Sequence, residues 1–104
     1  MSLVRSDTLQ QLEAWFAKRC DGEWEHDHGI SIQSTDNPGW WVKISLQGTA
    51  LEGKPFDEVK RGDLSLDPQP PWLRCYVEEN TFNGAGDVTT LAEILDIFLT
   101  WSAE

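Results

Sequence analysis

The sequence predicts an α+β fold, in which a four-stranded antiparallel sheet (meander) carries an N-terminal and a C-terminal helix packed on one face. Two segments repeat apolar residues at helical spacing, and several others alternate apolar and polar residues. The connections between them are short, which favours antiparallel neighbours. With 104 residues, the chain is expected to form a single domain over residues 1–104.

The two expected helices each carry an apolar stripe. The first covers Asp7 to Cys20, with Asp7 as its N-cap, and Gly22 can supply a left-handed stop. The second begins near Thr90, which forms a capping box with Glu93. The stripe residues recur at intervals of three and four: Leu9, Leu12, Trp15 and Phe16, then Leu91, Ile94, Leu95, Phe98 and Trp101. Each helix therefore needs an apolar surface to cover.

Four segments are expected to form strands: residues 29–34, 40–46, 56–66 and 72–79. Pro38 and Gly39 suit a turn, so the first two strands form a hairpin. Three prolines between positions 68 and 71 require a loop before the fourth strand. Residues 80–88, "NTFNGAGDV", are expected to form the loop that leads into the second helix.

Strand alternation predicts two different sheet faces. The face that receives both helices is apolar and contains Val42, Ile44, Leu46, Leu73, Cys75 and Val77. The opposite face stays open, as an antiparallel sheet allows, and contains Gln33, Trp41, Lys43, Trp72, Arg74 and Tyr76. Amphipathic aromatic residues are enriched at protein interfaces. The alternative is that long loops cover these aromatic side chains.

The chain is strongly acidic. Its net charge is -10, with 18 acidic against 8 basic residues, which disfavours nucleic acid and anionic membranes as partners. A basic protein partner would be attracted, although acidity also serves solubility alone. The chain has no apolar run of about 18 residues, and its first ten residues lack the apolar stretch of a signal peptide. We therefore expect a cytoplasmic protein.

The cysteines and histidines indicate structural roles. Cys20 and Cys75 are expected to be buried thiols, because a reducing compartment disfavours a disulfide. His26 and His28 are the only histidines, and strand phase directs both toward the core. Zinc needs three or four ligands, so histidines satisfied by local hydrogen bonds are favoured over a metal site.

Four carboxylates surround one tryptophan between residues 21 and 27. Catalysis by paired carboxyls needs two groups facing each other across a cleft, which one short segment does not make. A solvated acidic edge is the simpler interpretation, although Glu25 follows Trp24 and is the carboxylate most open to shielding. No nucleophile elbow or phosphate loop is present. We predict no catalytic residue, no cofactor and no metal.

Four motifs follow one another along the chain: "CDGEWEH", "DNPGWWVKI", "LEGKPF" and "FNGAG". In this order they resemble the immunity protein 53 family of bacterial polymorphic toxin systems, over residues 9–101. The resemblance implies a non-enzymatic antitoxin that binds a cognate protein toxin and blocks its active site. An acidic inhibitor suits a nuclease-type toxin with a basic cleft. We expect an architectural role for most of the residues that carry this resemblance: Trp24, Glu25, Pro38, Gly39, Trp40, Gly84 and Gly86.

Under this hypothesis, two groups of residues bind the toxin. Acidic residues steer the encounter: Asp21, Glu23, Glu25, Asp27 and Asp36. Aromatic residues then anchor the complex: Trp41, Trp72 and Tyr76. Two alternatives stay open. One is a small metal- or carboxylate-dependent enzyme using the region of Glu25, His26 and His28. The other is a structural homodimer in which the open aromatic face pairs with itself.

Overall fold

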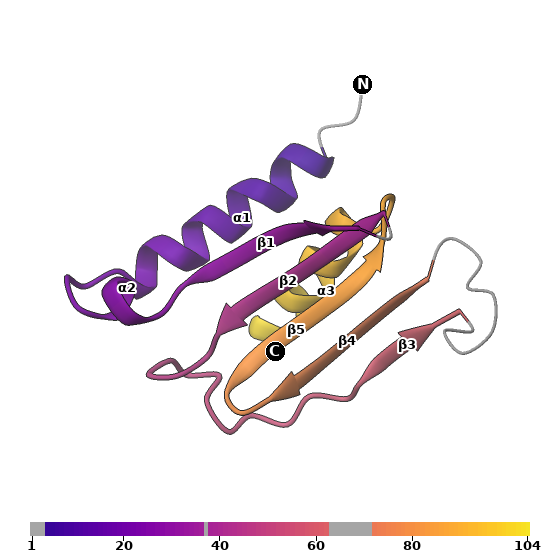
Figure 1. Ribbon diagram of the computed structural model, residues 1–104. Helices are drawn as coiled ribbons and strands as arrows, with labels where there is room; N and C mark the ends of the chain where they lie inside the picture. Colours follow the sequence, from indigo (N-terminus) through magenta and orange to yellow (C-terminus); the bar gives the residue numbers. More distant parts are fainter. Residues whose placement is uncertain (1–3, 37, 63–71) are drawn as a thin grey trace.

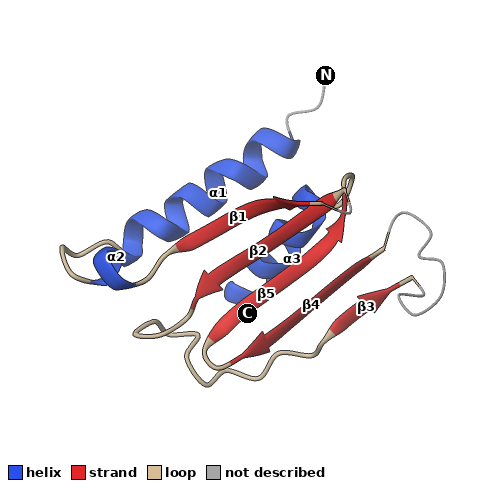
Figure 2. Ribbon diagram, viewed as in Figure 1, coloured by secondary structure: helices blue, strands red, loops and turns tan. Residues whose placement is uncertain are grey.

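The computed structural model describes residues 4–36, 38–62 and 72–104, with the backbone alone for residues 4–6. Figures 1 and 2 show an antiparallel sheet with helices on one side and the other face open toward the reader. The elements are α1 (Val4–Arg19), α2 (Trp24–Asp27), β1 (Ile30–Thr35), β2 (Gly39–Ser45), β3 (Val59–Arg61), β4 (Leu73–Glu78), β5 (Thr81–Asp87) and α3 (Leu91–Ser102). None of the helices in these ranges is long and apolar enough to cross a membrane.

The α+β class is confirmed, but the sheet has five strands instead of the predicted four. The additional strand is β5, in the segment predicted as a loop. Gly84 and Gly86 lie on its helix-facing side, where an added Cβ would collide with Ile94 and Thr90 respectively. The glycines are therefore needed where α3 approaches the sheet. They also remove the apolar residues by which alternation identifies a strand, which is why the prediction failed.

The strand order β1-β2-β5-β4-β3 differs from the predicted meander. Strand β5 lies between β2 and β4, and a two-residue turn with positive φ at Glu79 (52°) and Asn80 (60°) joins it to β4. Such turns match the twist of a hairpin. The predicted third strand, 56–66, reduces to β3 in the described part. Residues 63–71, including the predicted proline loop, lie outside the described residues.

The first hairpin is confirmed. Strands β1 and β2 pair antiparallel from Ile30 opposite Ile44 to Thr35 opposite Gly39. Ile32 lies opposite the buried Val42 on the helix-facing side, but it is 39% exposed because β1 is an edge strand.

The core lies between the sheet and α3. Five of the six predicted core-face residues are buried and Val77 is half-buried; the buried ones are Val42, Ile44, Leu46, Leu73 and Cys75. In α3, Ile94, Leu95, Phe98 and Trp101 are buried as predicted. Helix α1 packs against α3. The Thr8 hydroxyl donates to Asp96 Oδ1 at 2.7 Å, and the Trp15 and Phe98 rings meet edge to face at 5.0 Å.

The helix ends differ from the sequence prediction. Helix α1 begins at Val4, so Asp7 is no N-cap and its carboxylate accepts a hydrogen bond from Gln11 Nε2 at 2.8 Å. Gly22 does adopt the expected positive φ, 95°. Thr90 precedes α3, but its hydroxyl donates to the Asp87 carbonyl at 2.9 Å. Local sequence thus located the helices better than their caps.

Candidate binding surface

The acidic segment after α1 folds back on itself. Asp21 Oδ1 accepts hydrogen bonds from the amides of Glu23 and Trp24, both at 2.9 Å. The amides of Trp24 and Glu23 hold the pKa of Asp21 below its usual value. The Glu25 carboxylate in turn accepts from the Asp21 amide at 3.0 Å and the Gly22 amide at 2.9 Å. Two of the four carboxylates therefore close this turn, while Glu23 and Asp27 stay exposed.

The turn is fixed to the rest of the chain through Trp24. Its indole Nε1 donates to the Gln47 carbonyl at 2.7 Å, and its ring is buried. The prediction that both histidines face the core is wrong, because residues 24–27 are helical and break the strand phase. His26 is exposed, whereas His28 is half-buried and its Nδ1 lies 3.2 Å from the Ser45 hydroxyl. Within the described ranges, no three His, Cys, Asp or Glu side chains form a group able to hold a metal ion.

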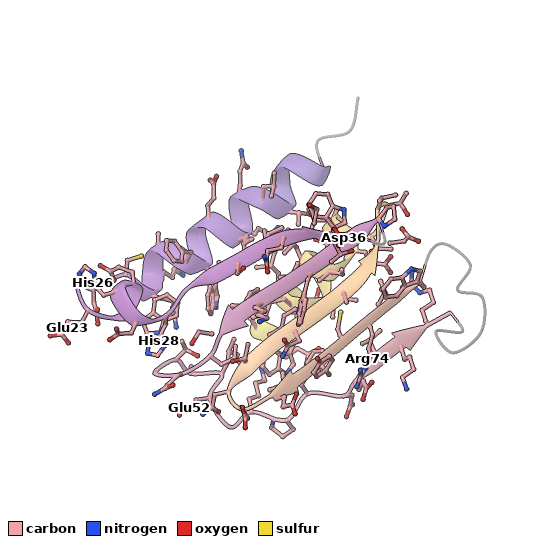
Figure 3. The ribbon with its side chains drawn as sticks, in the orientation of Figure 1. Glu23, His26, His28, Asp36, Glu52 and Arg74 are labelled. Carbon is pink, nitrogen blue, oxygen red and sulfur yellow. The ribbon has the colours of Figure 1, made fainter. Side chains whose placement is uncertain are left out.

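The five predicted steering residues do not gather in one place. Asp36 lies at the β1–β2 turn, at the opposite end of the sheet from Glu23 and His26 (Figure 3). Its carboxylate is exposed. The acidic residues therefore flank the sheet at two ends.

The open face of the sheet brings the predicted aromatic residues together with cations. We call the side of β2, β4 and β5 that faces away from α3 the aromatic face, defined by Trp41, Lys43, Arg74, Tyr76, Asn83 and Ala85. Trp41 and Lys43 are exposed, Asn83 is buried and the other three are half-buried. Two cross-strand rows build it, since residues directly opposite share a face. Trp41 aligns with Ala85 and Arg74, and Lys43 aligns with Asn83 and Tyr76. Because β5 was predicted as a loop, sequence reasoning missed Asn83 and Ala85.

Both aromatic side chains of this face interact with a cation. Lys43 Nζ lies 4.6 Å from the centroid of the Trp41 ring, and Trp41 is 41% exposed. The Arg74 guanidinium lies 4.3 Å from the Tyr76 ring centroid. Each contact fixes a ring and a cation side by side, which makes both available to a partner at low entropic cost.

Glu58 orients Arg74 from the neighbouring chain segment. Its Oε2 lies 2.6 Å from Arg74 Nε and 4.0 Å from Lys60 Nζ. The hydrogen bond from Arg74 holds the pKa of Glu58 below its usual value. Arg74 and Lys60 therefore share one carboxylate beside the aromatic face.

Trp72, the third predicted anchor, is placed differently. It is half-buried and precedes β4, where its amide donates to Asp87 Oδ2 at 3.1 Å and its carbonyl accepts from the Asp87 amide at 3.1 Å. Burial raises the pKa of Asp87, but hydrogen bonds from the Thr89 hydroxyl and amide and the Trp72 amide outweigh it and lower that pKa. Trp72 thus belongs to a structural hydrogen-bond network as well as to the edge of the face.

A hollow lies between the segment that follows the acidic turn and the aromatic face. It has a volume of about 570 Å³ and is lined by Asp27, His28, Lys43 and Glu79, among others. Asp27 and Lys43 therefore border one hollow, although they belong to different predicted groups. The structure joins part of the acidic segment to the aromatic face and leaves Asp36 apart.

The cysteines differ from each other. Cys20 is exposed, which corrects the prediction of two buried thiols, whereas Cys75 is fully buried in the core. Burial raises the pKa of Cys75 to about 12. A thiol in that state is inert at neutral pH.

Comparison with known protein families identifies the chain. The model of the family described as Immunity protein 53 matches residues 9–103. The chain belongs to this family, whose members serve as immunity proteins, the antitoxins of toxin systems. A search of curated proteins and a search of solved structures found no match.

Proposed function

We propose that this immunity protein binds its cognate toxin through the aromatic face and covers the toxin's active site. The observation that carries the proposal is the uncovered sheet face, on which Trp41 is 41% exposed and paired with Lys43. Large aromatic residues and arginine supply most of the energy at protein interfaces. In this mechanism the protein acts by binding, without catalysis, in the cytoplasm of the producing cell.

The charge supports a nuclease-type toxin. A net charge of -10 attracts the basic cleft with which a nuclease holds nucleic acid, and opposite potentials raise association rates to about 10⁸–10⁹ M⁻¹s⁻¹ at low salt. Glu23, Asp27 and Asp36 are exposed and suited to steering. Asp21 and Glu25 contribute charge, but their carboxylates also serve the turn.

We expect the cognate toxin to be encoded by the gene next to this one, and the test uses that toxin domain. Co-expression of the wild-type chain should protect cells from that toxin. Trp41→Ala should weaken binding by about 30-fold, the equivalent of a 2 kcal/mol interface residue. Ile32→Ala is the matched control, because Ile32 is similarly exposed (39%) on the other side of the sheet. Calorimetric titration measures both affinities.

Four results would contradict the proposal or one of its parts. If cells die equally with and without the wild-type chain, the protein is not the antitoxin of that toxin. Equal losses for Trp41→Ala and Ile32→Ala remove the aromatic face as the binding site. If sizing chromatography shows a wild-type dimer that Trp41→Ala converts to a monomer, the face serves a homodimer instead. An association rate that does not change with ionic strength removes the steering component.

A further inference from the structure

A second surface lies at the Asp36 end of the molecule. There α1, α3, the start of β2 and the segment between β5 and α3 enclose a groove of about 470 Å³. We call it the apolar groove, after the side chains that form most of its lining: Leu9, Trp40, Val88, Leu91, Ala92 and Leu95. It shares no residue with the aromatic face.

Two side chains of this groove are unusually exposed. Among the residues that the structure describes, only four large apolar side chains are exposed, and Leu9 (54%) and Val88 (56%) are two of them. They come from different elements, α1 and the segment after β5, yet they line one groove. An exposed apolar patch built from separate elements is typical of an interaction site.

The segment that presents Val88 is held in place by many hydrogen bonds. Asp87 Oδ1 accepts from the amide and the hydroxyl of Thr89, each at 2.7 Å. The Thr90 hydroxyl donates to the Asp87 carbonyl at 2.9 Å. Val88 is therefore presented to solvent by a pre-organised backbone, which lowers the entropy lost when a partner binds.

The groove offers an apolar surface with its polar side chains already engaged. Trp40 Nε1 donates to the Val88 carbonyl at 3.1 Å, so the indole presents only its ring. The hydroxyls of Thr8 and Thr89, which also line the groove, donate to Asp96 and Asp87. Because these groups are engaged within the chain, the complementary occupant is an apolar side chain.

Acidic side chains border the groove: Asp96 and Asp87 accept hydrogen bonds from Thr8 and Thr89 in its lining. Asp7 precedes Thr8 on α1, and Asp36 lies in the turn that leads to β2, whose Gly39 pairs with Asp87. Figure 3 shows Asp36 at the end of the sheet where β5 terminates. No lysine or arginine is among the residues that line the groove. A partner with lysine or arginine beside its apolar side chain complements this charge.

We propose that the apolar groove is a second binding site for the toxin, which inserts an apolar side chain flanked by lysine or arginine. The inference rests on the proposed function and adds a contact that the aromatic face does not supply. The toxin is then held at two places, on the open face and at the Asp36 end of the sheet.

The test measures binding of the inactivated toxin domain encoded by the adjacent gene. Val88→Lys puts a cation against the basic segment and removes apolar surface, so binding should weaken at least about tenfold. Leu9→Lys alters the same groove from α1 and should act in the same direction. Ile32→Lys introduces the same charge at an exposed apolar position elsewhere, and should change the affinity less than either groove variant. Thermal melting checks that all three variants remain folded.

The outcomes separate this inference from the proposed function. If the wild-type chain does not bind the toxin, the proposed function fails for that toxin, and with it the occupant assigned here. If the wild type binds but Val88→Lys and Leu9→Lys bind as tightly, only the groove inference fails. A wild-type dimer that Val88→Lys dissociates would make a second copy the occupant. A large loss of thermal stability with intact toxin binding would mean that the groove is filled from within the chain. Both of these results overturn the inference.

Discussion

The two faces of the sheet arise from the same strands but place aromatic residues in opposite environments. On the helix-covered face, the Phe82 ring lies 5.2 Å from Phe98, and both side chains are fully buried. On the aromatic face, the partners of Trp41 and Tyr76 are cations, and Trp41 is 41% exposed. Strand alternation therefore separates residues that stabilise the fold from residues available to a partner. Substitutions on the two faces should differ in what they damage.

The largest effect is expected on the helix-covered face. Phe98→Ala removes a buried ring that contacts Trp15 and Phe82 and should lower the free energy of unfolding by about 3–5 kcal/mol. Urea denaturation measures this loss. The fraction that stays folded should bind the toxin with nearly wild-type affinity. If Phe98→Ala binds the toxin more weakly than its unfolded fraction accounts for, the two faces do not have separate roles.

Gly84→Ala tests how closely α3 approaches the sheet. The added Cβ would overlap Ile94 Cγ2, and overpacking of this kind costs about 1–3 kcal/mol. Gly29→Ala is the matched control, since a Cβ there meets no atom within 4 Å, and it should change stability by less than about 0.5 kcal/mol. Denaturation curves showing equal stability for the two variants would refute the close approach.

Asp87 lies on the open side of the sheet, yet its hydrogen bonds should stabilise the fold. Asp87→Asn should lower the free energy of unfolding by about 1–2 kcal/mol at pH 7. The charged carboxylate accepts hydrogen bonds from the amides of Trp72, before β4, and Thr89, before α3, and the substitution weakens both. The folded-state pKa is lowered, so this stabilisation is present above the ordinary carboxyl pKa and lost as pH falls through the lower folded value. The difference between variant and wild type should therefore shrink below about pH 4. Urea denaturation at several pH values measures it, and a loss that stays the same from pH 7 down to pH 3 would contradict this role of the carboxylate.

The smallest effect is expected at Lys43. Lys43→Ala removes an exposed cation–π contact with Trp41, which is worth about 0.5–1 kcal/mol. Toxin affinity should fall about two- to fivefold, as measured by titration. Lys18→Ala, at the exposed end of α1, controls for the loss of one positive charge. An identical response from both variants would mean that Lys43 acts only through net charge.

Two of the motifs that carry the family resemblance hold distant segments of the chain together. In "LEGKPF", Lys54 Nζ donates to the carbonyls of Trp101 and Glu104, both at 2.8 Å. In "CDGEWEH", Trp24 donates to the Gln47 carbonyl. Their distinctive residues connect segments that are distant in the sequence. Such residues identify the fold, whereas the binding candidates lie beside them.

Local patterns predicted the parts of the fold that depend on neighbours in the sequence. The stripe of α3, the hairpin of β1 and β2, and the shared face of Trp41 and Lys43 all follow from helical or strand periodicity. The same approach failed for His28 and Leu9. The helical turn before β1 changed the phase at His28, and Leu9 belongs to an apolar stripe that α3 does not fully cover.

By itself, the sequence determined the family, the α+β class, the acidic charge and the residues that alternate between the two sheet faces. Only the tertiary structure decided that β5 fills the centre of the sheet, and that Asp21 and Glu25 close a turn. It also brought Leu9 and Val88 into one groove. The physical reason is distance along the chain. Periodicity records how each residue relates to its near neighbours, whereas β5 pairing and the groove depend on contacts between segments far apart in the sequence.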